Sequence, residues 1–304
     1  ANIARIKSSM TEPDWISARL QNDLAYAGHP YALNGGGTLT TLAAITRADL
    51  QNFVKNNLSR DRLHIGVAGD ITPAELAVML DKIFGGLPAA AKTTPLADIT
   101  IQNTGKTYLY QQDIPQSFIN LLSPGLDYKD PDFYAGNVMN FILGGSGFGS
   151  RLTEEVREKR GLTYGIYSSL YDMDHANGFS IGLSTENKNA GAALKIIRDE
   201  LAKMRDQGVT AQELSSAKSY LIGSLPLSFS STSAIAGALL SLQMHDYPMD
   251  HYDRYPAIIS GITRDDIERV SRRLLNPDQM LGVVVGQPQG ITPTQVLTRL
   301  PNVE

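Results

Sequence analysis

Two segments of the chain, 217 residues apart, align without a gap. Residues 45–69 read ITRADLQNFVKNNLSRDRLHIGVAG, and residues 262–286 read ITRDDIERVSRRLLNPDQMLGVVVG. The identical positions are Ile45, Thr46, Arg47, Asp49, Leu58, Asp61, Val67 and Gly69, which match residues 262, 263, 264, 266, 275, 278, 284 and 286. A period this long is far beyond that of a solenoid unit, so the repeat indicates a duplicated domain.

Each copy has the pattern of a helix followed by a strand. Thr46 and Thr263 can each cap a helix, with an aspartate three residues further on. Alternating apolar residues then predict a strand that ends at a glycine. These residues are Leu63, Ile65 and Val67 in the first copy, and Leu281, Val283 and Val285 in the second. In the first copy a second capped helix is expected from Thr72, with Pro73 at its first position.

The two copies are preceded by unequal lengths of chain. About 160 residues, starting near 101, precede the second copy within its domain, whereas 44 precede the first. The first domain is therefore expected to lack about 110–120 residues at its N-terminus, as in a fragment or a clipped product. The predicted organisation is a partial first domain over 1–88, a linker rich in Pro, Ala and Thr over 89–100, and a second domain over 101–304.

Helical and strand patterns are mixed without the regular alternation of a parallel α/β fold. We expect helices over 1–28, 131–143, 151–160 and 189–206 and from Thr210, a flexible loop over 34–41, and strands over 105–112, 117–123, 162–171 and 178–185. This mixture predicts the α+β class, with a mostly antiparallel sheet backed by helices.

The composition excludes several classes of protein and site. The net charge of −4 and the lack of a Lys/Arg run give no reason to expect a nucleic-acid partner. No segment approaches the ~20 apolar residues that a membrane span needs. Because the chain has no cysteine, a disulfide framework, a catalytic thiol and a cysteine-based zinc site are excluded.

The five histidines do not form a recognisable zinc motif, since none lies in an HExxH or HxxEH pattern. His245 and His251 are clustered, but their spacing puts them on different helix faces and Pro248 lies between them. No metal site is therefore predicted in this chain. No GxSxG nucleophile pattern is present either.

A glycine loop, GGSGFGS, occupies residues 144–150. It lacks the GK[ST] ending of a phosphate loop. It contains Gly144, Gly145, Gly147, Gly149 and Ser150. Two interpretations remain open: a tight connection between helices, or a loop whose backbone approaches a ligand closely.

Residues 150–171, SRLTEEVREKRGLTYGIYSSLY, predict a helix that stops at Gly161 and a strand after it. The reversal lets Arg157 and Tyr164 face one site. Arginine donates in a planar fork and tyrosine through a directional hydroxyl, so the pair could bind a peptide carbonyl or the oxyanion formed from it. The same residues also fit an exposed arginine on a charged helix and a half-buried strand tyrosine.

The segment from 131 to 170, PDFYAGNVMNFILGGSGFGSRLTEEVREKRGLTYGIYSSL, resembles the insulinase/pitrilysin family of zinc peptidases. The family signature has a glycine-rich loop, then SRL, then REKRGLxY. Further parts of the chain resemble the same family: IPQSFINLLSPGL at 114–126, GHPYALNGGGTL at 28–39, AKSYLIGSLPLSF at 217–229 and both copies of the repeat. The resemblance thus covers nearly the whole chain.

The resemblance implies a pair of homologous α+β domains that forms half of a clamshell around a peptide. In this family one half supplies HxxEH and a glutamate on zinc, and the other supplies an Arg and a Tyr seven residues apart. It therefore implies Arg157 and Tyr164 as the residues that bind the substrate carbonyl and complete the partner's site. The glycine loop, with Ser150, is expected near the substrate or the partner.

No HxxEH is present in this chain, so no cofactor is expected in it and zinc is expected in a partner subunit. Residues 211–260 most resemble the bacterial subunit that lacks zinc and acts on unfolded peptides with a zinc-bearing subunit. Two alternatives remain: the remainder of a complete zinc subunit whose HxxEH lies upstream, and a non-catalytic scaffold. The resemblance and the lack of cysteine suggest a bacterial protein of the periplasm, or alternatively of the cytoplasm.

Overall fold

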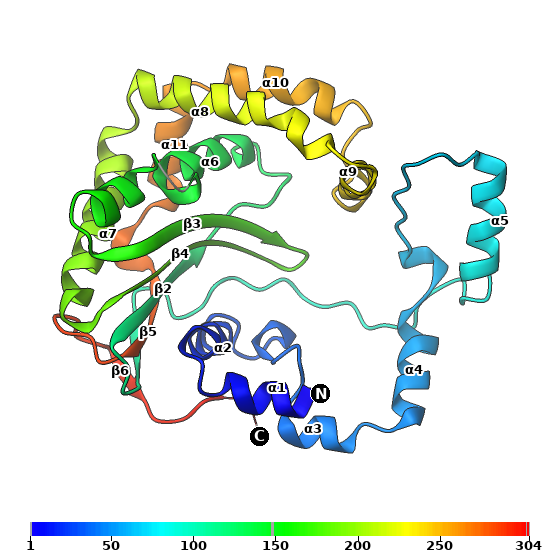
Figure 1. Ribbon diagram of the computed structural model, residues 1–304, viewed down its shortest axis with the longest axis horizontal. Coiled ribbons are helices and arrows are strands. Elements are labelled where there is room, and N and C mark those ends of the chain that lie inside the picture. Colours follow the sequence, from blue (N-terminus) through cyan, green and yellow to red (C-terminus); the bar gives the residue numbers. More distant parts are fainter. Residues whose placement is uncertain (1, 147–148, 302, 304) are drawn as a thin grey trace. The chain divides into compact units, whose positions relative to one another are not determined.

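A computed structural model describes residues 2–146, 149–301 and 303 (Figure 1). The chain divides into two compact units, each made of separate segments. The sheet unit comprises residues 1–42, 97–218 and 261–304, and the helical unit comprises residues 43–96 and 219–260. The boundary between residues 96 and 97 falls within the predicted linker, whereas the division into domains stays a prediction.

The sheet unit contains one six-stranded sheet in the order β3-β4-β2-β5-β1-β6. Its strands are β1 (Thr107–Gln111), β2 (Gln116–Pro124), β3 (Thr163–Met173), β4 (Ala176–Glu186), β5 (Leu281–Gly286) and β6 (Gln295–Leu297). The pairings among β3, β4, β2 and β5 are antiparallel, and β1 is parallel to both β5 and β6. The predicted α+β class is confirmed.

Helices cover both faces of this sheet. Helices α6 (Phe133–Asn140), α7 (Ala190–Gln207) and α11 (Arg264–Leu274) pack together over one face, and α2 (Pro13–Ala25) crosses β2 and β5 on the other (Figure 1). Ile16 and Leu20 of α2 are buried against Val283 and neighbouring strand residues. The remaining helices are α1 (Asn2–Ser9), α3 (Leu39–Ala44), α4 (Arg47–Asn57), α5 (Pro73–Phe84), α8 (Ala211–Ser224), α9 (Thr232–Met244) and α10 (His251–Gly261).

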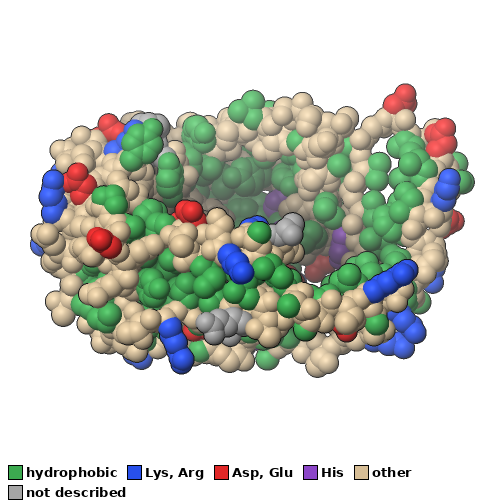
Figure 2. Space-filling model, turned by 60° about the horizontal axis from the view of Figure 1, so that its bottom comes forward, with side chains coloured by type: hydrophobic (Ala, Val, Ile, Leu, Met, Phe, Trp, Pro, Cys, Tyr) green, Lys and Arg blue, Asp and Glu red, His purple; other side chains and the backbone are tan. Residues whose placement is uncertain are grey.

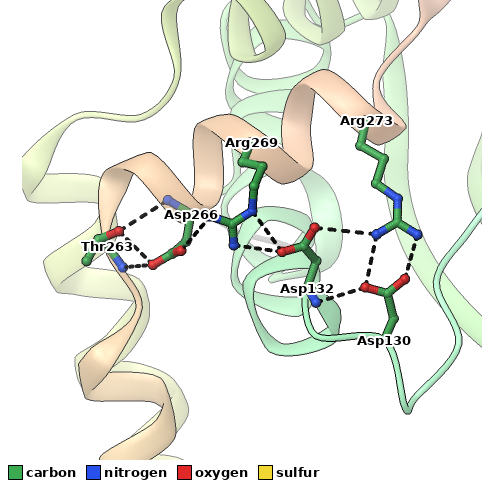
Figure 3. A network of polar contacts seen from close by, with 6 residues as sticks. All are labelled: Asp130, Asp132, Thr263, Asp266, Arg269 and Arg273. Atoms are coloured by element: carbon green, nitrogen blue, oxygen red, sulfur yellow. Dashed lines mark hydrogen bonds and ion pairs between the residues drawn. The ribbon is translucent and has the colours of Figure 1, made fainter.

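A polar network joins α11 to the start of α6 (Figure 3). Arg269 donates to Asp132 from Nε at 3.1 Å and from Nη2 at 2.7 Å. Arg273 bonds to both carboxylate oxygens of Asp130 and lies 3.4 Å from Asp132. Helix α11 is therefore held against α6 by charged hydrogen bonds as well as by apolar packing.

Two expectations near the N-terminus are wrong. The single helix expected over 1–28 is divided into α1 and α2, because Glu12 is extended (φ −83°, ψ 118°) and Pro13 begins the second helix. Proline has no amide hydrogen and disfavours the helical conformation of the residue before it. The loop expected over 34–41 is partly helical: Thr38 Oγ1 accepts a hydrogen bond from Thr41 N at 3.1 Å, which supports the start of α3.

The two repeat copies agree at their helices. Thr46 with Asp49, and Thr263 with Asp266, each form a capping box, and α4 and α11 both have 11 residues. A third capping box, Thr72 with Glu75, opens α5 as predicted. These boxes depend on residues three apart, so the local sequence is enough to specify them.

The copies differ at the segment after the helix. Residues 281–286 form β5 between β1 and β2, but residues 63–68 pair with no strand among the described residues, so the strand expected there is wrong. A strand needs neighbours for its backbone groups. Here the segment lies against α9 instead: Gln243 Nε2 donates to Ile65 O at 2.9 Å, and a Cβ on Gly66 would lie 2.1 Å from Ala236 O.

The apolar face of α4 is also exposed where that of α11 is buried. Leu50 and Phe53 are each 58% exposed, whereas their equivalents Ile267 and Val270 are 0% exposed. Among the described residues, only the second copy is covered by a sheet and helices, so the same sequence pattern has two environments in one chain.

Amide hydrogen exchange is expected to separate the two copies. Amides of residues 281–286, paired on both sides, should exchange at least about a hundredfold more slowly than amides of residues 63–68. Mass spectrometry of peptic peptides from both segments, recorded at one pH and temperature, measures the ratio. Equal protection of the two segments would show that the first copy has strand partners.

Candidate functional site

Arg157 lies on a short helix that is firmly packed on the sheet unit. The helix runs from Arg151 to Glu158, and its last six residues form the π-helical turn η4 (Thr153–Glu158). Leu152 and Val156 are 0% exposed and fix its inner face. Arg157 is on the opposite, accessible part, with 26% of its side chain exposed.

The charged residues around Arg157 pair with one another. Glu155 accepts hydrogen bonds of 2.6 Å from both Lys159 and Arg160, and these bonds lower the pKa of Glu155 to about 2. Arg157 Nε is 3.4 Å from Glu158 Oε1. The guanidinium carbon of Arg157 also lies 5.1 Å from the centre of the Tyr164 ring, within the range of a cation–π contact.

Tyr164 follows the helix after a sharp reversal. Gly161 ends the helix with a φ of +59°, a conformation that glycine adopts without strain. Leu162 N then donates to Val156 O at 3.0 Å, which directs the chain back along the helix. The result is that Tyr164, seven residues after Arg157, lies beside it.

A bulge at the start of β3 presents Tyr164 to solvent. Thr163 is opposite Thr185 and Ile166 is opposite Leu183, so two residues of β3 face one residue of β4. Gly165 N donates to Thr163 Oγ1 at 3.1 Å, which stabilises the bulge. Tyr164 is 89% exposed. Bulges commonly redirect a side chain next to a functional site.

The structure therefore brings Arg157 and Tyr164 together at an exposed position. Strand β3 is at one edge of the sheet, so one side of its backbone has no partner strand in the described part of the chain. The role of the pair in binding a substrate stays a prediction.

Packing within the chain explains two glycines of the glycine loop. A Cβ on Gly144 would lie 2.6 Å from Ser168 Oγ and 3.0 Å from Ser168 N, on the inner side of β3. A Cβ on Gly145 would lie 2.6 Å from Asn140 Nδ2. These glycines allow the end of α6, and the turn η3 (Phe141–Gly145) that continues it, to pack closely on the strand.

The remaining loop positions differ from one another. Gly149 has a φ of +90° and no atom within 4 Å of a Cβ placed on it. Ser150 is 0% exposed and its hydroxyl donates to Thr153 Oγ1 at 3.0 Å, so it supports the helix of Arg157 from inside. Gly147 lies outside the described residues. A role of this loop toward a substrate or partner stays a prediction.

A partly buried ion pair fixes the start of the same helix. Arg151 donates to both oxygens of Glu213, at 2.6 and 2.8 Å, and to Gly208 O at 3.0 Å. Burial raises the pKa of Glu213, but the bonds from Arg151 and Thr210 outweigh it and lower that pKa to about 2. The pair ties the helix of Arg157 to the connection between α7 and α8.

Replacing Glu213 by glutamine is expected to destabilise the sheet unit by about 2 kcal/mol at neutral pH, because two charged hydrogen bonds are lost. The folded pKa of about 2 lies below the usual 4.5, so the contribution is complete above about pH 5 and is lost as the pH falls toward 2. Urea unfolding followed by the fluorescence of Trp15, the single tryptophan, measures the difference. A difference that persists unchanged at pH 2.5 would contradict this explanation.

One cluster of histidines lies in the helical unit. His245, Tyr247 and His251 form an aromatic stack in the helical unit, with ring centres 5.5 and 4.0 Å apart, and burial lowers the pKa of His251. Within the described part of the chain, no group of three or more His, Cys, Asp or Glu side chains is placed to hold a metal ion.

The face drawn in Figure 2 carries scattered acidic and basic side chains and no broad patch of one sign. Among the described residues no single helix is long and apolar enough to span a membrane. The helical segments Ala211–Phe229 and Thr232–Met244, with a bend of 113° between them, pass that test together on length and composition alone.

Two features were not singled out from the sequence. One is Tyr167, 62% exposed on β3 three residues after Tyr164. Its type and spacing are typical of many strand tyrosines, so the sequence offered no signal for it. The other is the network of Asp132, whose partner Arg269 is 137 residues away.

Comparison with known proteins gives a consistent result. A family model described as the peptidase M16 inactive domain matches residues 44–221. A protein of Streptomyces coelicolor named an uncharacterized zinc protease is 30% identical over 254 residues, which is 82% of this chain and 55% of the relative. The non-peptidase homolog YmxG of Helicobacter pylori is 30% identical over 232 residues, which is 74% of this chain and 52% of the relative.

The fold is similar to solved structures as well. The crystal structure of a peptidase M16 inactive domain from Pseudomonas fluorescens aligns with a TM-score of 0.82 and 26% identity, over 96% of this chain and 69% of that chain. This chain spans about half the length of the two curated relatives described above.

Proposed function

The chain belongs to the peptidase M16 (insulinase/pitrilysin) family, of which it contains the domain described as inactive, and on this basis we propose that it is the substrate-binding subunit, without zinc, of a heterodimeric metallopeptidase that hydrolyses peptides. The observation that carries the proposal is the contact between Arg157 and Tyr164 at the exposed start of an edge strand. The guanidinium carbon of Arg157 lies 5.1 Å from the centre of the Tyr164 ring. Both side chains supply hydrogen-bond donors, a guanidinium and a phenolic hydroxyl.

In the proposed complex the zinc belongs to the partner subunit, which carries HxxEH. There the metal would supply a Lewis acid and activate water. The described residues of this chain contain no comparable group of ligands, so its own contribution is to bind and orient the peptide.

The guanidinium of Arg157 and the hydroxyl of Tyr164 both donate hydrogen bonds, and both can reach one acceptor because the side chains are already in contact. A substrate carbonyl oxygen gains negative charge as it is attacked, so two donors bind the transition state more strongly than the ground state. An extended peptide could lie along β3 as an added strand, which would present successive carbonyls to the pair.

Two other functions of the same family retain support. The chain spans about half of a relative named a zinc protease, which fits the remainder of a complete zinc subunit. Another relative is named a non-peptidase homolog, which fits a scaffold without catalytic role.

Reconstitution tests the proposal. We expect the purified protein, in its full natural length, to bind no stoichiometric zinc and to hydrolyse no peptide, and to restore hydrolysis when mixed with an HxxEH-bearing subunit that is inactive alone. Metal analysis and a quenched fluorescent peptide measure both properties. Stoichiometric zinc in the protein alone, or full activity of the zinc subunit without it, would overturn the proposal.

A further inference from the structure

Two tyrosines of β3 occupy equivalent positions on the strand. Tyr167 is opposite Gly182 of β4, and Tyr171 is opposite Gly178. They are four residues apart, so both project from the same face of the sheet. Tyr171 packs against the apolar cluster that contains Ile16 and Leu20 of α2, so this is the face that α2 covers.

Tyr171 has a structural role at its position. Its ring covers Gly178 so closely that a Cβ on that glycine would lie 2.2 Å from the ring. Its hydroxyl is 2.9 Å from the hydroxyl of Tyr26, and burial raises the pKa of Tyr171. A tyrosine that fills the space over a cross-strand glycine stabilises the sheet.

Tyr167 does not cover the glycine opposite to it. A Cβ on Gly182 would meet only Asn120 Oδ1, at 3.1 Å, and no atom of Tyr167. The ring leans along its own strand toward the bulge, 3.2 Å from the position of a Cβ on Gly165. With 62% of the residue exposed, and no hydrogen bond from the described residues to its hydroxyl, Tyr167 has no packing role comparable with that of Tyr171.

The position of Tyr167 relative to the Arg157–Tyr164 pair sets what it could contact. Tyr167 is three residues beyond Tyr164, and the bulge lies between them. A strand rises ~3.3 Å per residue, so along the strand Tyr164 and Tyr167 are about as far apart as two or three residues of an extended peptide. The ring lies over Gly165, whereas a Cβ on Gly182 would meet only Asn120 Oδ1, so the space for a large side chain is on the Gly182 side of the ring.

We infer that Tyr167 is a specificity-determining residue for a peptide substrate, whose large apolar or aromatic side chain packs on its ring two or three residues from the peptide bond bound by Arg157 and Tyr164. This inference rests on the proposed function of the same site. Ring–ring contacts have preferred geometries and contribute beyond the buried area. A preference of about three- to tenfold for phenylalanine over glycine is therefore expected at one of these positions.

The test uses the reconstituted heterodimer and two series of peptides. One series has Phe and the other has Gly at a single position, two or three residues before or after the cleaved bond, and the peptides are otherwise identical. We expect the preference in kcat/KM to be lost in Tyr167→Ala and kept in Tyr167→Phe. Tyr220→Ala is the matched control, because Tyr220 is also 62% exposed but belongs to the helical unit. A preference that survives Tyr167→Ala, or that Tyr220→Ala removes as well, would overturn the inference.

A second measurement separates this inference from the proposed function. The binding of fluorescein-labelled Phe and Gly peptides to the isolated chain is measured by anisotropy, which needs no partner and no zinc. Tighter binding of the Phe peptide to wild type than to Tyr167→Ala would support the inference even if reconstitution gives no hydrolysis. If reconstitution gives no hydrolysis, either of two binding results would overturn the inference: equal binding of the Phe and Gly peptides, or no binding at a millimolar concentration of the chain.

Discussion

Replacing Arg157 by alanine is expected to lower kcat/KM of the reconstituted heterodimer by about 10²- to 10³-fold, because a donor aimed at the developing oxyanion is lost. Tyr164→Phe is expected to cost about 10²-fold by the same reasoning. It removes the hydroxyl but keeps the ring on which the guanidinium lies, 5.1 Å from its centre. Initial rates with a quenched fluorescent peptide measure both effects.

The folded state should hardly change in either variant. Tyr164 is 89% exposed, and the substitution of Arg157 leaves the buried residues of its helix unchanged. The free energy of unfolding should therefore shift by less than about 0.5 kcal/mol. Arg160→Ala is the matched control for loss of a nearby positive charge, because Arg160 pairs with Glu155. Its rate should remain within about twofold of wild type.

The double variant Arg157→Ala, Tyr164→Phe shows whether the two residues act on one oxygen. Donors to the same oxyanion are coupled, so the double variant should lose less than the product of the single losses. Hydrolysis that is unchanged in both single variants would instead support the scaffold function. Losses that multiply fully would indicate two separate roles.

The local parts of the fold could be predicted from the sequence. The capping boxes at Thr46, Thr72 and Thr263 depend on residues within one turn, and all three are present. Residues 63–68 have the same alternation as β5 but form no strand with the described residues, because a ladder depends on partners distant in the sequence. The expected absence of about 110–120 residues from the first domain stays a prediction.

The candidate site shows the same division. Arg157 and Tyr164 are joined by a short reversal at Gly161, so their proximity followed from the local pattern. The different surroundings of Tyr167 and Tyr171 could not be predicted, because they depend on cross-strand glycines and on Tyr26, 145 residues from Tyr171.

The network of Figure 3 is expected to give the largest loss of stability on substitution: Asp132→Ala should lower the free energy of unfolding of the sheet unit by about 3 kcal/mol. Asp132 is 7% exposed and accepts bonds from Arg269 and Arg273, which would lose their partner. The loss should fall at the lower end for a buried pair, because the two arginine side chains are 56% and 49% exposed and can turn to water. Urea unfolding followed by Trp15 fluorescence measures it.

Asp206→Ala is the control for that measurement, since Asp206 forms an exposed pair with the adjacent Arg205 and should change stability by less than about 0.5 kcal/mol. The network should also depend on pH. The bonds from Arg273 lower the pKa of Asp130, so its contribution is complete above the usual value of 3.8 and is lost as the pH falls through the lower, folded value. Equal stability losses for Asp132→Ala and Asp206→Ala would show that the network does not hold α11 on α6.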